Sequence, residues 1–207
     1  MPDLSLEASL GGVVAGIDEV GRGPLAGPVI AAAVIIDPAT LPARLAEELD
    51  DSKKLSARKR NALATLVLDS CRCGFGEATV AEIDRMNILK ATFLAMERAL
   101  EALEALEALG RPVDHALVDG NQVPPLGCKV RCVVGGDGLS LSIAAASVIA
   151  KVRRDRLMAE LALRHPGYGW EKNAGYGTAQ HLDALRRLGP TPHHRSSFAP
   201  VAQLSLL

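Results

Sequence analysis

Two apolar segments, residues 13–20 and 26–36, constrain the fold of this chain more than any other feature. They predict two β-strands, and Gly21-Arg22-Gly23-Pro24 between them predicts a tight turn. The first strand carries two adjacent acids, Asp18 and Glu19. Burying an ionised carboxylate without a partner is costly, and a bound cation is one explanation for such a pair. Because neighbours on a regular strand point to opposite faces, either the strand bends here or each acid reaches a different ion around the edge.

The remaining hydrophobic patterns predict one α/β domain. Further strands are expected at residues 71–80, 113–119 and 129–134, and helices at residues 45–68, 81–109, 140–165 and 179–188. Five strands with helices mostly after the third indicate a mixed five-stranded sheet flanked by helices. We expect this domain, with a C-terminal helical extension, to span residues 13–198, and we expect residues 1–12 and 199–207 to be flexible tails.

Composition excludes several classes of protein. A hydrophobic content of 48% rules out a disordered chain, and a formal net charge of -1 rules out a strongly basic, histone-like binder. The longest apolar stretch, residues 25–36, is too short to span a membrane, and the acidic N-terminus lacks a secretory signal. We therefore expect a soluble cytoplasmic protein, and the presence of one core without a repeated apolar surface favours a monomer.

Two more acids stand where ligands usually bind in α/β proteins. Asp119 ends the strand at 113–119, and Asp137 lies between a strand and a helix within Gly135-Gly136-Asp137-Gly138. Oxygen ligands from three segments suit hard cations such as Mg²⁺ or Mn²⁺, and two such ions can hydrolyse a phosphodiester. Each acid alone is also a common turn residue beside glycine, so the adjacent pair at 18–19 carries most of this hypothesis.

Basic runs and a group of aromatic residues indicate a nucleic-acid partner. The runs at 53–60 and 151–156 suit a polyanion on one side of the molecule, although such runs are often simply solvated faces. Tyr168, Trp170 and Tyr176 lie in one glycine-rich loop. They can stack on a base or a sugar, or they can form a local hydrophobic clasp.

Seven segments, in order along residues 13–198, resemble bacterial type 2 ribonuclease H (ribonuclease HII). They are Gly16-Ile17-Asp18-Glu19-Val20-Gly21-Arg22-Gly23 with its continuation to residue 28, Asp51-Ser52-Lys53-Lys54-Leu55-Ser56, and residues 118–120, 136–137, 144–155, 175–178 and 194–198. A series of this length is far more specific than any single motif. One departure is Ala174, where the family often has a lysine before Gly-Tyr-Gly. The related type 3 enzymes usually lack the arginine that is present here as Arg22.

The resemblance implies a ribonuclease H-like fold and a metal-dependent endonuclease with a two-metal Mg²⁺ or Mn²⁺ site. Its substrates would be RNA/DNA hybrids and duplex DNA with embedded ribonucleotides, cut on the 5′ side to leave 3′-hydroxyl and 5′-phosphate ends. By matching position, the catalytic and metal-binding acids are Asp18, Glu19, Asp119 and Asp137. The matching substrate-binding residues are Gly21, Arg22 and Gly23 for the ribose 2′-hydroxyl, Tyr176 for the neighbouring sugar, and Lys53, Ser147, Lys151 and Arg154 for phosphates.

The end of the chain carries a separate resemblance. Gln203, Leu204, Leu206 and Leu207 are similar to the short peptide with which bacterial replication proteins dock on the sliding clamp, although Leu207 stands where an aromatic residue is usual. The other interpretation is a frayed terminus.

Two other functions are alternatives to a nuclease. The intact acid set disfavours a hybrid-binding module without activity, and the basic runs disfavour a carboxylate-pair glycosidase.

Overall fold

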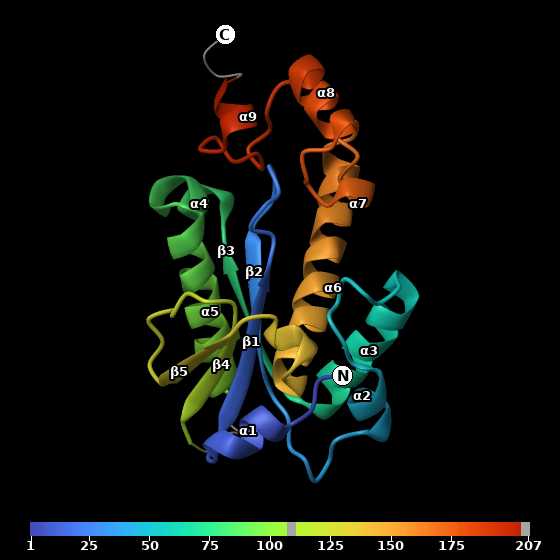
Figure 1. Ribbon diagram of the computed structural model, residues 1–207. Coiled ribbons are helices and arrows are strands. Elements are labelled where there is room, and N and C mark those ends of the chain that lie inside the picture. Colours follow the sequence, from blue (N-terminus) through green and yellow to red (C-terminus); the bar gives the residue numbers. More distant parts are fainter. Residues whose placement is uncertain (107–110, 204–207) are drawn as a thin grey trace.

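A computed structural model describes residues 1–106 and 111–203, and its centre is a mixed five-stranded sheet (Figure 1). The strands are β1 (Val14–Val20), β2 (Val29–Ile35), β3 (Arg72–Ala78), β4 (His115–Asp119) and β5 (Lys129–Val133). Their order in the sheet is β3-β2-β1-β4-β5. The pairs β1–β2 and β2–β3 are antiparallel, whereas β1–β4 and β4–β5 are parallel. The predicted sheet is confirmed, and it places β1 at the centre.

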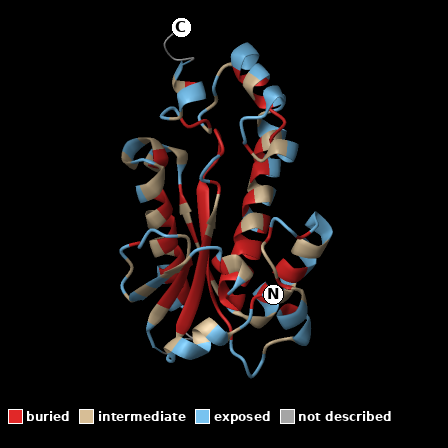
Figure 2. Ribbon diagram, viewed as in Figure 1, coloured by how far each residue is buried: buried red, intermediate tan, exposed pale blue. Residues whose placement is uncertain are grey.

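Helices cover both faces of this sheet. On one face lie α4 (Val80–Met86) and α5 (Ile88–Glu104), and on the other lie α2 (Ala43–Glu48), α3 (Ala57–Ser70) and α6 (Leu141–Arg164). Each face buries its own alanine-rich cluster, and Figure 2 shows the buried centre of the molecule in red. Small residues let the helices approach closely, since a Cβ at Gly74 would lie 2.2 Å from the carbonyl oxygen of Ala99 in α5. This close approach explains how a core with few aromatic residues can be well packed.

Two of the predicted helices are each divided in two. The sequence predicts one continuous helix over residues 45–68, but residues 49–56 between α2 and α3 are not helical. Ser56 caps α3 by accepting a hydrogen bond from the backbone N–H of Lys59. The helix predicted over 81–109 breaks at Asn87, whose φ of 76° ends α4 and whose side chain caps α5. The side chains of capping residues bond to the backbone and so favour the end of a helix over its continuation. The hydrophobic pattern carries no information on these bonds, so it predicts single helices. Residues 107–110 lie outside the described part of the chain.

The N-terminal residues pack on the domain. The sequence predicts a flexible tail over residues 1–12, but Ser5–Leu10 form the helix α1. The Glu7 carboxylate accepts hydrogen bonds from the hydroxyls of Ser140 and Ser142, each at 2.6 Å, and from the Ser142 N–H at 3.0 Å. These bonds satisfy polar groups at the start of α6. The N-terminal segment therefore anchors the first turn of that helix.

A C-terminal extension surrounds the far end of α6 (Figure 1). It contains α7 (Trp170–Asn173), α8 (Ala179–Leu188) and α9 (Ala199–Ala202). The hydroxyls of Ser196 and Ser197 donate to the Asp84 carboxylate at 2.7 and 2.6 Å and tie the extension to α4. Val201 in α9 is buried, so the flexible tail expected over 199–207 is wrong for residues 199–202, and residues 204–207 lie outside the described part of the chain. No helix in the described ranges is long and apolar enough to cross a bilayer.

Candidate active site

Asp18 and Glu19 lie near the end of β1 and leave opposite faces of the sheet. The pairing of β1 with β2 continues without interruption from Gly16 to Val20, so the strand does not bend at the two acids. Asp18 pairs with Ala32, which packs in the cluster under α6, and Glu19 pairs with Ala31, which packs in the cluster under α5. The two carboxylates therefore start from opposite faces of β1, and the arrangement in which each reaches a different ion around the edge stays a prediction.

Asp119 lies beside Asp18 because β4 is the parallel neighbour of β1. Ile17 pairs with Val118, so the residues that follow them are also neighbours. One Asp119 carboxylate oxygen accepts a hydrogen bond of 2.7 Å from the N–H of Gly136, which opens the short 3-10 turn η2 (Gly136–Gly138) that carries Asp137. A Cβ at Gly136 would lie 2.6 Å from the Ile143 side chain. This glycine therefore lets the turn approach close to the end of β4.

Burial and the charges of neighbouring acids raise the pKa values of Asp18, Glu19 and Asp137. The pKa of Asp18 lies well above its usual range, first because the side chain is buried and then because the charges of Glu19 and Asp119 are close. Burial also raises the pKa of Glu19, although Arg22 contacts its carboxylate at 3.3 Å and opposes this shift. The pKa of Asp137 is raised by burial and by its acidic neighbours. A site that disfavours carboxylate charge in this way is one that a cation stabilises.

The sequence reasoning missed Asp51 and the role of Ser52. The charge of the neighbouring Asp51 carboxyl helps to raise the pKa of Asp137. The Ser52 hydroxyl accepts a hydrogen bond of 3.0 Å from the hydroxyl of Ser147, which in turn contacts Asp18. Asp51 precedes the basic run at 53–60, and this adjacency was the signal available in the sequence. The segment before α3 thus reaches the acids from the side of α6.

The donor set suits a hard divalent cation, but the side chains are not assembled around one point. Among residues 1–106 and 111–203, no three acidic, imidazole or thiol side chains lie close enough to enclose an ion as they stand. Two of the acids form hydrogen bonds to other groups, since Asp119 accepts from Gly136 and Glu19 accepts from Arg22. Carboxylate oxygens are the ligands that Mg²⁺ and Mn²⁺ prefer. By chemistry, therefore, the residues fit these ions.

The glycine turn and Tyr176 lie against each other in the structure. Gly21 has a φ of 98°, and the following residues Arg22 and Gly23 are exposed. A Cβ at Gly23 would lie 3.4 Å from a ring carbon of Tyr176, which is 47% exposed. The turn and this tyrosine therefore form one continuous surface beside the acids.

The other two aromatic residues of the predicted loop do not face a ligand. Tyr168 and Trp170 are buried, and their rings stack with centroids 5.1 Å apart. The Trp170 ring N–H donates to His181, and the Tyr168 hydroxyl donates to the carbonyl oxygen of Gly189. The hydrophobic clasp is the correct interpretation for these two residues, and base stacking is wrong for them.

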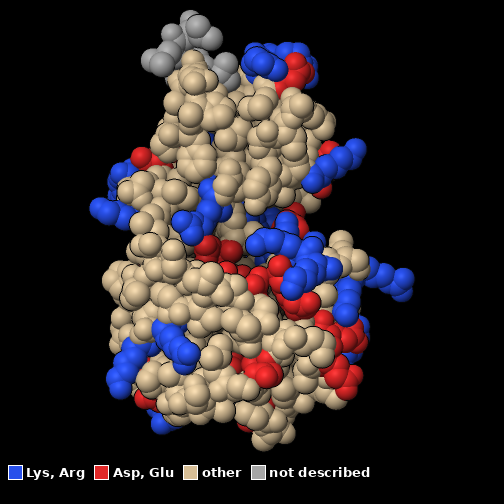
Figure 3. Space-filling view, viewed as in Figure 1, with Lys and Arg blue, Asp and Glu red and all other residues tan. Residues whose placement is uncertain are grey.

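The four residues predicted to contact phosphates differ in their exposure. Lys53 is exposed, and Lys151 is partly exposed and paired with Asp155. Ser147 is buried against Ser52. Arg154 is 0% exposed, so a phosphate contact is wrong for this residue. Figure 3 shows acidic side chains inside a hollow across the middle of one face, with lysine and arginine side chains on its sides.

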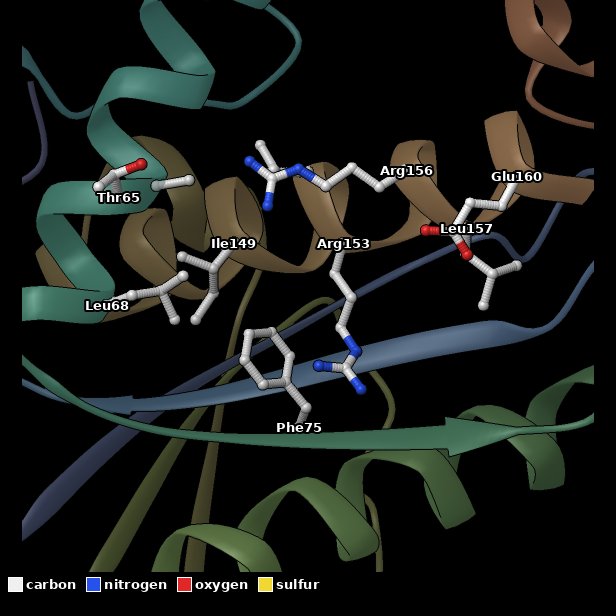
Figure 4. A pocket seen from close by; sticks show the side chains of 10 residues that line it. Thr65, Leu68, Phe75, Ile149, Arg153, Arg156, Leu157 and Glu160 are labelled. Atoms are coloured by element: carbon white, nitrogen blue, oxygen red, sulfur yellow. The ribbon is translucent and has the colours of Figure 1, made fainter.

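The basic run at 151–156 also contributes to a second hollow. A groove of about 360 Å³ lies between α3, β3 and α6, and Figure 4 shows Arg153 and Arg156 extending over its apolar lining. The Arg153 guanidinium carbon lies 4.6 Å from the centre of the Phe75 ring. None of the predicted site residues lines this groove. The run is therefore not a single phosphate-facing surface, because the helix distributes its side chains around the axis.

Comparisons with known proteins agree with the fold and the order of the motifs. The sequence model of the Ribonuclease HII family matches residues 15–201. A Ribonuclease HII from Paramagnetospirillum magneticum is 71% identical over 206 residues, which cover 100% of both chains. In the PCNA:RNase HII complex from Archaeoglobus fulgidus, the matching chain superposes with a TM-score of 0.72 at 26% identity, covering 88% of this chain and 93% of that one. Bst-RNase HIII in complex with Mn²⁺ has the same fold, with a TM-score of 0.77 at 20% identity over 100% of this chain and 74% of that one. The chain described here therefore belongs to the ribonuclease HII family and is a ribonuclease H, an enzyme that acts on RNA/DNA hybrids.

Proposed function

We propose that this ribonuclease H is a divalent-metal-dependent endonuclease that also cuts duplex DNA on the 5′ side of a single embedded ribonucleotide. The observation that carries the proposal is the gathering of Asp18, Glu19, Asp119 and Asp137 beside an exposed glycine turn. Burial raises the pKa values of Asp18, Glu19 and Asp137. Acids placed this close together repel one another and would repel a nucleic-acid backbone, unless bound cations neutralise them. The products would be a 3′-hydroxyl and a 5′-phosphate.

Four acids would hold the ions. Asp18 and Asp119 lie side by side on neighbouring strands and would be the central ligands, while Glu19 and Asp137 would complete the site from its two sides. When bound, Mg²⁺ or Mn²⁺ would supply activation of water and stabilisation of charge on the leaving oxygen. Ser147 contacts Asp18 and would keep its carboxylate oriented.

The turn and its neighbours would recognise the substrate. Gly21, Arg22 and Gly23 would contact the ribose 2′-hydroxyl, since glycine permits a close approach of backbone to a ligand. Tyr176 lies against Gly23 and would pack on the adjacent sugar. Lys53 and Lys151 would contact backbone phosphates from the side of α3 and α6. A deoxyribonucleotide at this position has no 2′-hydroxyl, so the polar groups of the turn would lose their hydrogen-bond partner. This loss would let the enzyme discriminate against DNA.

The decisive experiment is an assay on a DNA duplex that contains one ribonucleotide. We expect cleavage with Mg²⁺, none with EDTA, and none of an all-DNA duplex of the same sequence. Asp18→Asn is expected to lower the rate by a factor of at least about 10³, the size of effect seen when transition-state charge loses its stabilisation. The matched control is Asp69→Asn, since Asp69 is an exposed acid on α3. Full activity in EDTA, or in Asp18→Asn, would refute the proposal.

We also propose that the C-terminus docks on the bacterial sliding clamp, which would place the enzyme in DNA replication and repair in the cytoplasm. Gln203 follows α9, while Leu204, Leu206 and Leu207 lie outside the described residues. The Archaeoglobus fulgidus relative is described as a complex with PCNA, and this supports a clamp partner. Deleting residues 203–207 is expected to abolish binding to the clamp of the same cell and to leave cleavage unchanged. Unchanged clamp affinity would contradict this role, and light scattering would test the expectation of a monomer.

A further inference from the structure

Arg154 and Arg195 are two fully buried arginines whose guanidinium groups are bonded to backbone carbonyl oxygens. Both side chains are 0% exposed, and neither forms an ion pair with a carboxylate within residues 1–106 and 111–203. Burial lowers the pKa of Arg154 to about 10, and burial together with the charge of Arg154 lowers the pKa of Arg195 to about 9. Both side chains therefore stay protonated at neutral pH. Burying a cation without an acidic partner is costly. The hydrogen bonds of these two arginines therefore identify the segments that they hold in place.

Arg154 joins the turn between β1 and β2 to the segment that carries Tyr176. Its Nε donates to the carbonyl oxygen of Pro28 at 3.0 Å, and its Nη2 donates to that of Ala26 at 3.0 Å. Its Nη1 donates to the carbonyl oxygen of Ala174 at 2.9 Å, two residues before Tyr176. Ala174 has a φ of 48°, a conformation that is unusual for a residue other than glycine. The arginine thus holds strained backbone at the Tyr176 segment, where strain commonly accompanies function.

Arg195 forms hydrogen bonds with the other half of the same turn. Its Nη1 donates to the carbonyl oxygen of Arg22 at 2.9 Å, and its Nη2 donates to that of Gly21. Its Nε and Nη2 both donate to the carbonyl oxygen of Gly27, at 3.0 and 2.8 Å. The two guanidinium groups together bind five carbonyl oxygens of the 21–28 turn. The planar fork of arginine can satisfy several acceptors at once, whereas lysine presents a single point charge.

These bonds determine where the amides of the glycine turn point. In a trans peptide the C=O and the N–H lie on opposite sides. The carbonyl groups of Gly21 and Arg22 point inward to Arg195, so the N–H groups of Arg22 and Gly23 point away from it, toward the exposed surface of the turn. Among the described residues, neither N–H donates to a protein acceptor. Both are therefore free to donate to a substrate oxygen.

The turn also lies directly on the guanidinium groups. A Cβ at Gly21 would be 2.2 Å from Nε of Arg154, and a Cβ at Gly175 would be 2.5 Å from the carbonyl oxygen of Ala26. The N–H of Leu25 donates to the carbonyl oxygen of Gly175 at 2.8 Å and closes the contact between the two segments. A displacement of either arginine would therefore move the turn and the Tyr176 segment together.

We propose that Arg154 and Arg195 are positioning residues for ribonucleotide recognition. They hold the amides of Arg22 and Gly23 outward and keep Tyr176 in register with them, so that one ribose and its neighbouring sugar are read as a unit. This inference rests on the proposed function. It assigns the recognition geometry to two residues that do not touch the substrate, in place of the phosphate contact expected for Arg154.

The test uses Arg154→Lys and Arg195→Lys, which keep the charge and lose the fork. The matched control is Arg187→Lys, since Arg187 is an exposed arginine on α8. For each protein, kcat/KM is measured on a duplex with one ribonucleotide and on a long RNA/DNA hybrid. We expect a fall of about 10²-fold on the single-ribonucleotide duplex, the effect of a displacement of ~1 Å. We expect a fall about tenfold smaller on the hybrid, because a hybrid offers a 2′-hydroxyl at every nucleotide of the cut strand.

The ratio of the two kcat/KM values separates positioning from simple loss of folded enzyme. Loss of folded enzyme lowers both values equally, so an unchanged ratio in soluble, folded Lys variants would overturn the inference. Failure of the wild-type enzyme to cut the single-ribonucleotide duplex would instead overturn the proposed function. These two failures are therefore distinguishable.

A measurement on the wild-type enzyme covers the case in which the Lys variants do not fold. The Nε–H signals of Arg154 and Arg195 are followed by NMR in EDTA while duplex is added. A duplex with one ribonucleotide is expected to shift both signals more than an all-DNA duplex of the same sequence. Equal shifts with both duplexes would overturn the inference.

Discussion

Replacing Asp18 by asparagine should stabilise the metal-free enzyme while it abolishes cleavage. Asp18 is 7% exposed and has a raised pKa, because burial and the charges of Glu19 and Asp119 oppose its ionisation. A carboxyl whose pKa is raised by folding favours the folded state in its protonated form. Its contribution to stability is present below the unfolded pKa and is lost as the pH rises through the folded pKa. Asparagine has no such dependence.

The expected magnitude follows from the geometry of the sheet. Asp18 and Asp119 stand on neighbouring strands and on the same face, and the spacing of neighbouring strands, about 5 Å, serves as the distance between their charges. With an effective dielectric constant of about 20, the repulsion between two such charges is about 3 kcal/mol. The raised pKa of Asp18 lets this side chain avoid part of the repulsion by binding a proton, so we expect a gain of about 1–3 kcal/mol. For a chain of this size the melting temperature would rise by about 2–4 °C per kcal/mol.

The assay is thermal unfolding in EDTA across a pH series, with and without Mg²⁺. Asp18→Asn should unfold at a higher temperature than the wild type at about pH 8, and the difference should shrink as the pH falls. Mg²⁺ should raise the melting temperature of the wild type more than that of the variant, because a bound ion stabilises the folded state. Asp69→Asn, the exposed control, should show neither effect. A variant that is less stable than the wild type at high pH in EDTA would refute the reasoning.

Three further predictions test the fold around the site. Gly16→Ala should lower the free energy of unfolding in urea by about 1–3 kcal/mol, because its Cβ would lie 2.3 Å from the backbone of α6; an unchanged midpoint would show that the helix can shift. Arg98→Met should remove the ion pair with Glu82. In the wild type the stabilisation by this pair is lost as the pH falls from 4.5 toward the Glu82 pKa of about 2, and the variant should lack this loss. The effect should be at most about 1 kcal/mol, because the pair is partly exposed. Identical acid profiles would contradict this. Burial lowers the pKa of His194 to about 4, so the folded state favours the neutral ring and loses stability as the pH falls from 6.5 to 4. The fluorescence of Trp170, the single tryptophan, should then shift before the sheet unfolds, and a shift that coincides with global unfolding would contradict this local change.

Much of the fold was accessible from the sequence because strands and helices have different local signatures. The five apolar segments and the acids at their ends predicted the sheet and the candidate site, since burial of a strand depends mainly on its own side chains. The breaks in the helices were less accessible. Asn87 ends α4 and caps α5, and Ser56 caps α3, in each case through hydrogen bonds from the backbone to the side chain. Such residues also occur within helices.

The sequence by itself determined which chemical groups this protein possesses and where along the chain they occur. It placed Asp18 and Asp119 at strand ends and Tyr176 in a glycine-rich loop. Only the tertiary structure decided which way neighbouring side chains face. Arg153 lies over Phe75 in an open groove, while the next residue, Arg154, is buried beneath the glycine turn. The physical reason is that successive helix residues point about 100° apart, so the packing of α6 against distant segments determines which of two arginines meets solvent and which meets backbone carbonyl groups.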